Sequence, residues 1–439
     1  MRILFATIAA DGHVNPLTGL AMHLKAAGHD VRWYTGRSYA TRLERLGIPH
    51  VPYQRATEVN SENIAELFPE RARLRGPALI RFDAEHIFIG NVEQHFEDVR
   101  DVDATWPFDA LVCDAAFYAA RLIKEKLGKR VCSIGVAPSL EIDKDVPPAF
   151  SGLRPAGTGV GRLLHRCMGA AMDWLVMGPS KASYNRILVA HGLAPIEWSL
   201  FDEPYRSPDV VFQSGVPSLD YPRKAANPKV RFVGALLPYR AQAPAAFPYA
   251  DRLGEAQRVI LISQGTVDNR DPKKLIVPAL DALVDSGALL VVGTGHANTE
   301  QLRRAYPQAN VVVEDYVDFA AVLDRADLFI CNGGYGSVLL SLSKGVPEYV
   351  GVGINLRSEN PSPERIRRAA DRVLSEPSWK ARAMQLREEL SRYRPYELID
   401  AYLATTVAPS AGAQQHTGGM LEPRAAATRE PAAPIRQSG

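Results

Sequence analysis

Two glycine-rich loops and one histidine are the parts of this sequence whose residue types could do chemistry. The stretch NGGYGS, residues 332–337, lies between a buried-strand pattern, ADLFIC, and a helix pattern, SVLLSLSKG. Glycines let a ligand approach the backbone closely, and the free N–H groups and dipole at the start of a helix favour an anion. The sequence therefore predicts that this loop binds a phosphate or a diphosphate.

A second loop, SQGT at residues 263–266, follows another buried-strand pattern, RVILI. Neither loop has the spacing G-x-G-x-x-G or a Walker pattern, which counts against dinucleotide binding and nucleoside triphosphate hydrolysis. A plain strand-to-helix turn is the alternative interpretation of either loop taken alone.

His13 follows the first strand pattern, RILFATIA, and precedes the first helix pattern. Open α/β sheets bind ligands at the carboxyl ends of their strands, where a histidine can act as a general base near neutral pH. Asp114 ends a later strand, FDALVCD, so its carboxylate could orient the imidazole and leave one ring nitrogen free. Taken alone, His13 could be a loop residue without a role and Asp114 a helix cap.

The elements that must position these residues alternate as β-α-β units in two series. The first strand precedes a helix with Asn15 as its cap, Pro16 in its first turn and Gly28 at its end. The pattern returns in FDALVCD and RVCSIGVAP, and a second series runs from RVILISQGT, through a helix capped by Asp271, to DLFICNGG. This order predicts an α/β fold of two doubly wound domains that face a cleft.

A Pro/Ala-rich connection, YRAQAPAAFPYA, separates the two series. We therefore expect an N-terminal domain over residues 1–234 and a C-terminal domain over residues 235–407. Residues 408–439 contain almost no large apolar side chains, which predicts a disordered tail.

Helical stretches between residues 145 and 203 carry many large apolar side chains. We interpret them as core, with an apolar binding wall as the alternative. These large apolar side chains include Phe150, Met168, Met172, Trp174, Met177, Trp198 and Phe201.

Chain length, net charge and cysteine content exclude some classes of function. A chain of 439 residues needs at least two domains, and a net charge of +2 gives no long-range attraction to nucleic acid or anionic lipid. Three of the four cysteines lie in apolar runs and none forms a C-x-x-C pair, which predicts buried thiols in a reducing, cytoplasmic compartment. We expect no signal peptide and no integral membrane segment, because no apolar run is long enough.

Taken together, the motifs resemble the family-1 glycosyltransferases of the GT-B fold, which has two Rossmann-like domains, and especially the bacterial macrolide and flavonoid type. The resemblance rests on GHVNP at residues 12–16, Asp114 after VC, SQGT, and NGGYGS followed by KGVP, and it runs from Met1 to about Val407. It implies the inverting transfer of a hexose from a UDP- or dTDP-sugar to a hydroxyl group of an apolar small-molecule acceptor. The acceptor would be of the natural-product, flavonoid, macrolide or lipid type.

The resemblance also implies roles for single residues. His13 would remove the acceptor's proton, and Asp114 would orient and neutralise the histidine. No metal and no cofactor is implied, because helix N–H groups stabilise the departing diphosphate, and the apolar stretch before Glu203 would wall the acceptor pocket. The residues implied in donor-nucleotide binding are Gln264, Thr266, Tyr316, Val317, Asn332, Gly333, Gly334, Gly336 and Ser337.

The sequence departs from the family in three places. Asn332 stands where the family usually has histidine, and Leu340 where it has a ribose-binding glutamate. After GVP, relatives continue with a strand, a loop that binds the sugar hydroxyls and a helix, whereas here Pro347 is followed directly by EYVGVGINL. A crossover between parallel strands needs about a dozen residues, so we expect an internal deletion after Pro347.

Such a deletion exposes apolar surface and a sheet edge, which predicts a less stable second domain or a compensating oligomer. It leaves open a non-catalytic descendant with a deleted donor site that binds nucleotide or an apolar small molecule. A nicotinamide-dependent oxidoreductase ranks last, because the chain lacks the glycine fingerprint after the first strand.

Overall fold

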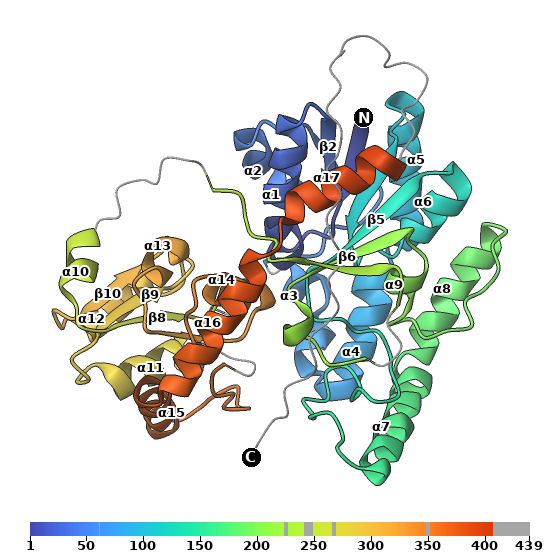
Figure 1. The fold of residues 1–439 in the computed structure, drawn as a ribbon. Coiled ribbons are helices and arrows are strands. Elements are labelled where there is room, and N and C mark those ends of the chain that lie inside the picture. The colour runs from blue at the N-terminus through green and yellow to red at the C-terminus, as the bar shows by residue number, and fades with distance from the viewer. Residues whose placement is uncertain (61, 224–226, 241–248, 266–268, 348–351, 407–439) are drawn as a thin grey trace.

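The computed structural model describes residues 1–60, 62–223, 227–240, 249–265, 269–347 and 352–406. They form two lobes, each built on a parallel sheet with helices against it (Figure 1). The first sheet has seven strands in the order β3-β2-β1-β4-β5-β6-β7, and the second has four in the order β10-β9-β8-β11. Strand order reverses beside the first strand of each series, as in a doubly wound sheet, so the predicted α/β class is confirmed.

The strands of the first sheet are β1 (Arg2–Ala6), β2 (Asp30–Thr35), β3 (His50–Pro52), β4 (Ala110–Asp114), β5 (Arg130–Gly135), β6 (Val210–Ser214) and β7 (Val230–Gly234). Those of the second are β8 (Val259–Ser263), β9 (Leu289–Gly293), β10 (Val311–Glu314) and β11 (Leu328–Cys331).

The helices between the strands of the first sheet are α1 (Asp11–Ala26), α2 (Ala40–Arg45), α3 (Ile64–Leu67), α4 (Gly76–Asp83), α5 (Val92–Thr105), α6 (Ala120–Leu127), α7 (Gly159–Ala171), α8 (Gly178–Ala190) and α9 (Glu203–Arg206). Two π-helical turns, η3 (Ala84–Ile89) and η4 (Met172–Val176), extend α4 and α7.

The later helices are α10 (Ala250–Glu255), α11 (Ile276–Leu283), α12 (Thr299–Ala305), α13 (Phe319–Leu323), α14 (Tyr335–Ser343), α15 (Pro363–Ser375), α16 (Pro377–Ser391) and α17 (Pro395–Thr406). Within the described ranges, none of the helices has the length and apolar character needed to cross a bilayer.

Helix α1 begins earlier than we predicted. The backbone N–H groups of His13 and Val14 both donate to the carbonyl oxygen of Ala10, at 2.9 and 3.0 Å, so the first turn already forms at Asp11. Asn15 is therefore not the cap, and Pro16 lies inside the helix, where it offers no N–H. As a result, His13 belongs to the first turn of a helix and not to a loop.

The predicted helix after Asp271 is also divided. Asp271 accepts a hydrogen bond from the backbone N–H of Lys273 at 3.0 Å, but this caps only a short 3-10 turn, Pro272–Lys274. Helix α11 starts separately at Ile276, because Leu275 has an extended φ of −145° that breaks the helical path.

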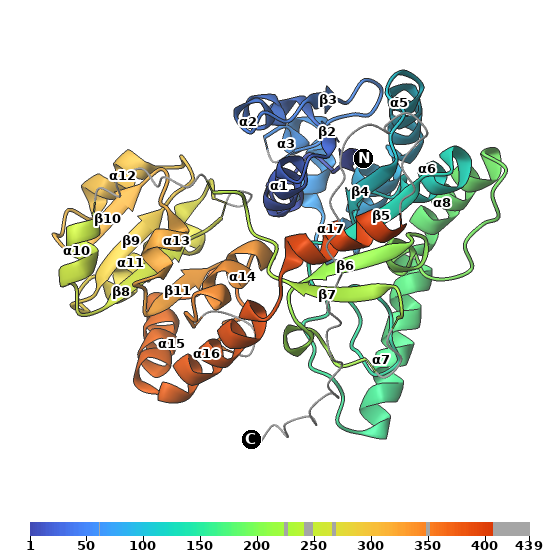
Figure 2. The same cartoon turned by 45° about the horizontal axis from the view of Figure 1, so that its top comes forward.

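Helix α17 packs on the first lobe, although it falls within the range predicted for the second domain. Ile399 and Leu403 are fully buried in the hydrophobic core of the first lobe. The Tyr396 hydroxyl donates to the carbonyl oxygen of Leu237 at 3.1 Å. Figures 1 and 2 both show α17 leaving α16 and lying along the first lobe. The end of the described chain thus ties the two lobes together, and the predicted tail lies outside the described residues.

The second sheet ends at β11 in the part of the chain that the structure describes. The backbone N–H of Phe329 in β11 donates to the carbonyl oxygen of Pro347 at 3.3 Å, so the chain that leaves α14 reaches the side of this edge strand. Residues 348–351, where we expect the deletion, lie outside the described residues. Beyond them Val352 is fully buried between α14 and α16. The deletion therefore stays a prediction.

A buried polar cluster joins β2 to α5 in the first lobe. The Tyr34 hydroxyl donates to Asp98 Oδ2 at 2.8 Å and lies 2.9 Å from His95 Nδ1. Because the hydroxyl proton points to Asp98, His95 Nδ1 must be the donor in the second contact. Burial in the protein interior lowers the pKa of His95 from 6.5 to about 4.

We expect the free energy of unfolding to fall as the pH is lowered from 6.5 to 4. The unfolded chain, with His95 near its ordinary pKa, binds more protons in this window than the folded chain, so protonation favours unfolding. The loss is about 3 kcal/mol at pH 4. Urea titrations at pH 7 and pH 4 measure it. The variant His95→Gln, which cannot titrate, should lose less stability, and an equal loss would contradict the assignment.

Candidate active site

His13 and Asp114 lie together at the carboxyl ends of β1 and β4. The parallel register pairs Ala6 with Cys113, so the residues that follow these strands meet at one edge of the sheet. His13 Nδ1 lies 2.9 Å from Asp114 Oδ1. The Asp114 side chain is buried, whereas 25% of the His13 side chain is exposed. A ligand can therefore reach His13 but not Asp114.

Asp114 is held by the backbone as well as by the histidine. The N–H of Ile8 donates to Oδ2 at 3.0 Å, and the N–H of Ala116 donates to Oδ1 at 2.7 Å. Because the Asp114 carboxylate can only accept hydrogen bonds, the neutral imidazole carries its proton on Nδ1, which faces Asp114. The basic lone pair is then on Nε2. Such a pair can remove a proton from a hydroxyl group, and the carboxylate stabilises the imidazolium that forms.

The two glycine-rich loops also lie side by side. Ser263 of β8 pairs with Cys331 of β11, so the loops leave the second sheet at the same edge. Asn332 Nδ2 donates to the carbonyl oxygen of Gln264 at 2.5 Å and links them directly. Gly265 has a φ of +74°, a left-handed conformation that suits glycine and lets Asn332 approach.

The later loop leads directly into α14. Gly333 has a φ of +77°, and Gly334 precedes the helix without any side-chain cap. The helix starts at Tyr335, two residues before the predicted start, and the N–H groups of its first turn have no partner within the helix. Gly336 is exposed, and a Cβ atom placed there would meet nothing within 4 Å. The loop therefore presents backbone N–H groups beside a space that a ligand could fill.

The remaining predicted donor residues have different surroundings. The Gln264 side chain is buried and holds the loop against α11, since Nε2 donates to the carbonyl oxygen of Asp271 at 2.9 Å and Oε1 accepts from the N–H of Ile276 at 3.3 Å. Tyr316 is 74% exposed after β10, and its ring meets His296 edge-on at 4.5 Å. Val317 packs against the core of the second lobe. Thr266 lies outside the described residues.

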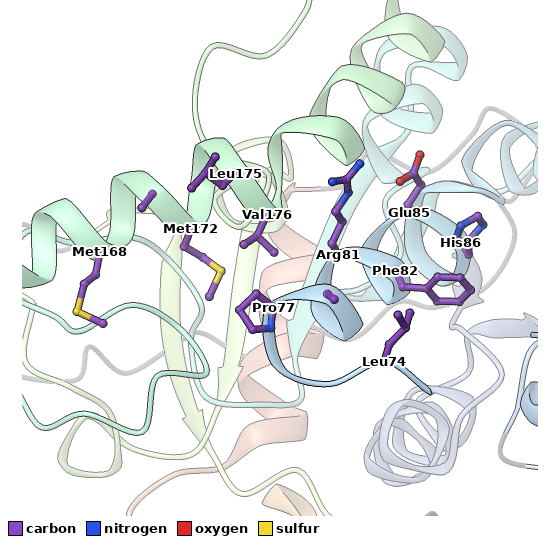
Figure 3. Close-up of a pocket in the computed structure, with 12 residues that line it drawn as sticks. Leu74, Pro77, Arg81, Phe82, Glu85, His86, Met168, Met172, Leu175 and Val176 are labelled. Atoms are coloured by element: carbon purple, nitrogen blue, oxygen red, sulfur yellow. The ribbon is translucent and has the colours of Figure 1, made fainter. Parts of the chain in front are cut away.

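A hollow of about 660 Å³ opens in the first lobe between α4–η3 and α7–η4 (Figure 3). In Figure 3, Met172 and Val176 extend from η4 toward Pro77 of α4, with Arg81 and Glu85 further along the same wall. Most of the lining is apolar. The lining residues are Leu74, Pro77, Ala78, Arg81, Phe82, Glu85, His86, Met168, Ala171, Met172, Leu175 and Val176.

Some of the apolar side chains between residues 145 and 203 are core residues, and others form the wall of the hollow, so each of our two interpretations holds for part of the set. Met177 and Phe201 are core residues, 2% and 6% exposed. Met168 and Met172 line the hollow, and Trp174 is 77% exposed beside it. The opposite wall, at residues 74–86, was not predicted from the sequence. Its mixture of apolar and charged residues is typical of an ordinary surface helix, so the sequence offered no signal of a cavity.

The part of the chain that the structure describes contains no group of three or more His, Cys, Asp and Glu side chains that could hold a metal ion.

Comparison with known proteins gives a consistent set of relatives. No family model matches the chain. The 4'-demethylrebeccamycin synthase of Lentzea aerocolonigenes is 33% identical over 408 residues, which cover 88% of this chain and 95% of that protein. UDP-glycosyltransferase 2 of Phaeomoniella chlamydospora is 26% identical over 433 residues, which cover 91% of this chain and 93% of that protein.

Solved structures show the same architecture. The calicheamicin glycosyltransferase CalG4 superposes with a TM-score of 0.71 at 19% identity, covering 93% of this chain and 99% of that one. The glycotransferase of kitacinnamycin gives a TM-score of 0.68 at 20% identity, with coverage of 93% and 99%. The spinosyn rhamnosyltransferase SpnG, solved with thymidine diphosphate, gives 0.65 at 17% identity, with coverage of 92% and 100%.

Proposed function

Because this chain belongs to the family-1 glycosyltransferases of the GT-B fold, we propose that it transfers a hexose from a UDP- or dTDP-sugar to an apolar natural product. Its relative at 33% identity is named for the synthesis of 4'-demethylrebeccamycin. Relatives named UDP-glycosyltransferase and a structural neighbour solved with thymidine diphosphate support the two candidate nucleotides.

The contact between His13 and Asp114 is the observation that carries this proposal. His13 Nε2 takes the proton of the acceptor's hydroxyl group while the hydroxyl oxygen attacks the anomeric carbon of the sugar. The bond from that carbon to the diphosphate oxygen breaks, and its electron pair leaves with the diphosphate. Attack from the side opposite the leaving group inverts the anomeric configuration. Asp114 keeps Nδ1 protonated and stabilises the positive charge on the ring.

The start of α14 would receive the diphosphate. The helix has nine residues, Tyr335–Ser343, and the N–H groups of its first turn point toward the exposed loop. Gly336 leaves space for an oxygen atom, and the Ser337 hydroxyl can add a hydrogen bond. These donors stabilise the negative charge that develops on the leaving group. Gln264, Thr266, Asn332, Gly333 and Gly334 complete the proposed phosphate site, with Gln264 acting as the buried support of its loop.

Tyr316 and Val317 would face the nucleotide base. The exposed ring of Tyr316 can stack on a flat heterocycle, while Val317 supports the chain from the core side. Leu340, in the position where the family has a ribose-binding glutamate, is partly buried against the same core and offers no hydrogen bond to a ribose.

The hollow between α4–η3 and α7–η4 would take the acceptor. Its apolar lining fits an aglycone with few polar groups, and its methionines can adapt to different ring systems. A non-catalytic descendant has less support, since His13 contacts Asp114 and Asn332 is hydrogen-bonded to Gln264.

Replacing the general base tests the mechanism. We expect His13→Gln to lower kcat for transfer by about 10²–10⁴-fold, because glutamine can occupy the site but cannot take the proton. Initial rates with UDP- and dTDP-glucose and an aromatic polyketide acceptor measure this effect. The control His23→Gln should stay within about twofold, since His23 lies between α1 and α17 beside Asp400 and belongs to neither proposed binding site. A His13→Gln variant with more than about a tenth of the normal rate would refute the role.

Gly336→Ala separates folding from donor binding. The new methyl group has free space in the unliganded protein and favours a helix by up to about 1 kcal/mol, so the variant should be at least as stable. The methyl group would occupy the proposed phosphate site, so nucleotide should no longer raise the melting temperature. For the normal protein, nucleotide at a hundred times Kd should add about 2.7 kcal/mol.

The matched control is Gly254→Ala, another exposed helical glycine with nothing near a new Cβ atom. It should keep the full response to nucleotide. An undiminished response in Gly336→Ala would place the diphosphate elsewhere.

Met172→Trp tests the acceptor site. The larger side chain would fill part of the hollow and should raise KM for the acceptor roughly tenfold, equivalent to about 1.4 kcal/mol. KM for the nucleotide sugar should not change, because the donor loops belong to the other lobe. Steady-state kinetics with each substrate varied in turn provide the measurement, and Trp174→Ala on the same turn but outside the lining is the control. A change in donor KM alone would exclude this hollow as the acceptor site.

A further inference from the structure

Tyr335 connects the proposed phosphate loop of the second lobe to the first lobe. It is the first residue of α14 and stands between Gly334 and Gly336. Its hydroxyl donates to the carbonyl oxygen of Ser214, the last residue of β6, at 2.7 Å. Figures 1 and 2 show α14 between the second sheet and the first lobe. A side chain of the donor loop is thus bonded to the sheet that holds the general base.

Two glycines make this contact possible. Gly215 has a φ of +105°, and a Cβ atom there would lie 2.4 Å from the Tyr335 hydroxyl oxygen. Gly234 has a φ of +84°, and a Cβ atom there would lie 2.5 Å from Tyr393 Cβ. The two glycines exchange backbone hydrogen bonds of 2.8 and 2.9 Å. Tyr335 and Tyr393 therefore pack on a glycine pair that no larger residue could replace without movement.

Apolar packing makes the junction rigid. Val216, which follows Gly215, is fully buried in one cluster with Leu339 and Leu342 of α14 and Leu390 of α16. Because close-packed side chains shift together, α14 and the end of β6 should move as one unit.

The same carbonyl group is linked to the acceptor side of the first lobe. The buried Gln213 donates through Nε2 to the carbonyl oxygen of Ser214 at 3.2 Å and to that of Ala137 at 2.7 Å. Ala137 begins the segment that runs from β5 toward α7 and the hollow. Ser214 therefore joins the donor loop, through Tyr335, to the segment that leads to the proposed acceptor site.

We propose that Tyr335 is a positioning residue that sets the distance between the diphosphate at α14 and the His13–Asp114 pair. The inference rests on the proposed function, because it requires a donor at α14 and an acceptor beside His13. A shift of α14 against β6 would move the anomeric carbon away from the attacking oxygen, and a misplacement of about 1 Å can cost about 100-fold in rate. Donor binding should not suffer, since the phosphate-binding groups all belong to the second lobe.

The variant Tyr335→Phe removes only the hydroxyl group and keeps the packed ring. We expect kcat for transfer to fall at least about tenfold, with KM for the nucleotide sugar within about twofold. Hydrolysis of the donor by water needs no aligned acceptor and should fall less. The ratio of hydrolysis to transfer should therefore rise, which a general loss of folded protein would not cause.

Two further variants define the contact. Tyr393→Phe is the matched control, because within the described residues the Tyr393 hydroxyl makes no hydrogen bond, and it should keep the normal ratio. Gly215→Ala keeps the Tyr335 hydroxyl but forces it away, and it should raise the ratio of hydrolysis to transfer. The double variant Gly215→Ala/Tyr335→Phe should be no worse than the worse single variant, as expected when two changes break one interaction.

The outcomes separate this inference from the proposed function. Absence of transfer and of any nucleotide response in the normal protein would overturn both. If the normal protein transfers sugar, an unchanged ratio in Tyr335→Phe would overturn the inference alone. A proportional loss of transfer, hydrolysis and nucleotide response would also overturn it, because that result describes a residue needed only for folding.

Discussion

The proposed active site depends on one buried carboxylate, Asp114. A buried charge is costly unless hydrogen bonds replace its water, and Asp114 accepts bonds from the N–H groups of Ile8 and Ala116 and from His13 Nδ1. The three donors belong to separate segments that meet because β1 and β4 are neighbours in the sheet. The strand order that builds the core therefore also sets the tautomer and the direction of the histidine.

The second requirement is that two lobes keep a defined relation, since the proposed acceptor site and donor site lie on different sheets. Contacts made by the last helices of the described chain meet this requirement. Helix α17 returns to the core of the first lobe, and α14 and α16 share an apolar cluster with the residues after β6. The glycine pair at the ends of β6 and β7 lets the backbones approach closely enough for Tyr335 to reach Ser214.

The deletion that we predict after Pro347 would affect the two sides of the proposed donor site unequally. Both glycine-rich loops leave β8 and β11, which pair directly with each other, so the phosphate side of the donor site does not depend on a later strand. The predicted deletion would remove the segment that, by resemblance to the family, binds the sugar hydroxyls. The chain reaches the edge of β11 at Pro347, and after the residues outside the described ranges Val352 is buried in one apolar cluster with side chains of α14 and α16.

Local patterns in the sequence determined the α/β alternation and the motifs at the ends of β1, β4, β8 and β11, because apolar runs and glycines act on their own stretch of chain. The resemblance of these motifs, taken as a set, indicated the family. The starts of α1 and α14 were misplaced by a few residues, since single backbone hydrogen bonds decide them. Only the tertiary structure decided that α17 joins the first lobe, that Gln264 points inward and that Tyr335 reaches Ser214, 121 positions away. These facts depend on which surfaces meet when the chain packs, and no spacing along the sequence encodes a contact between residues so far apart.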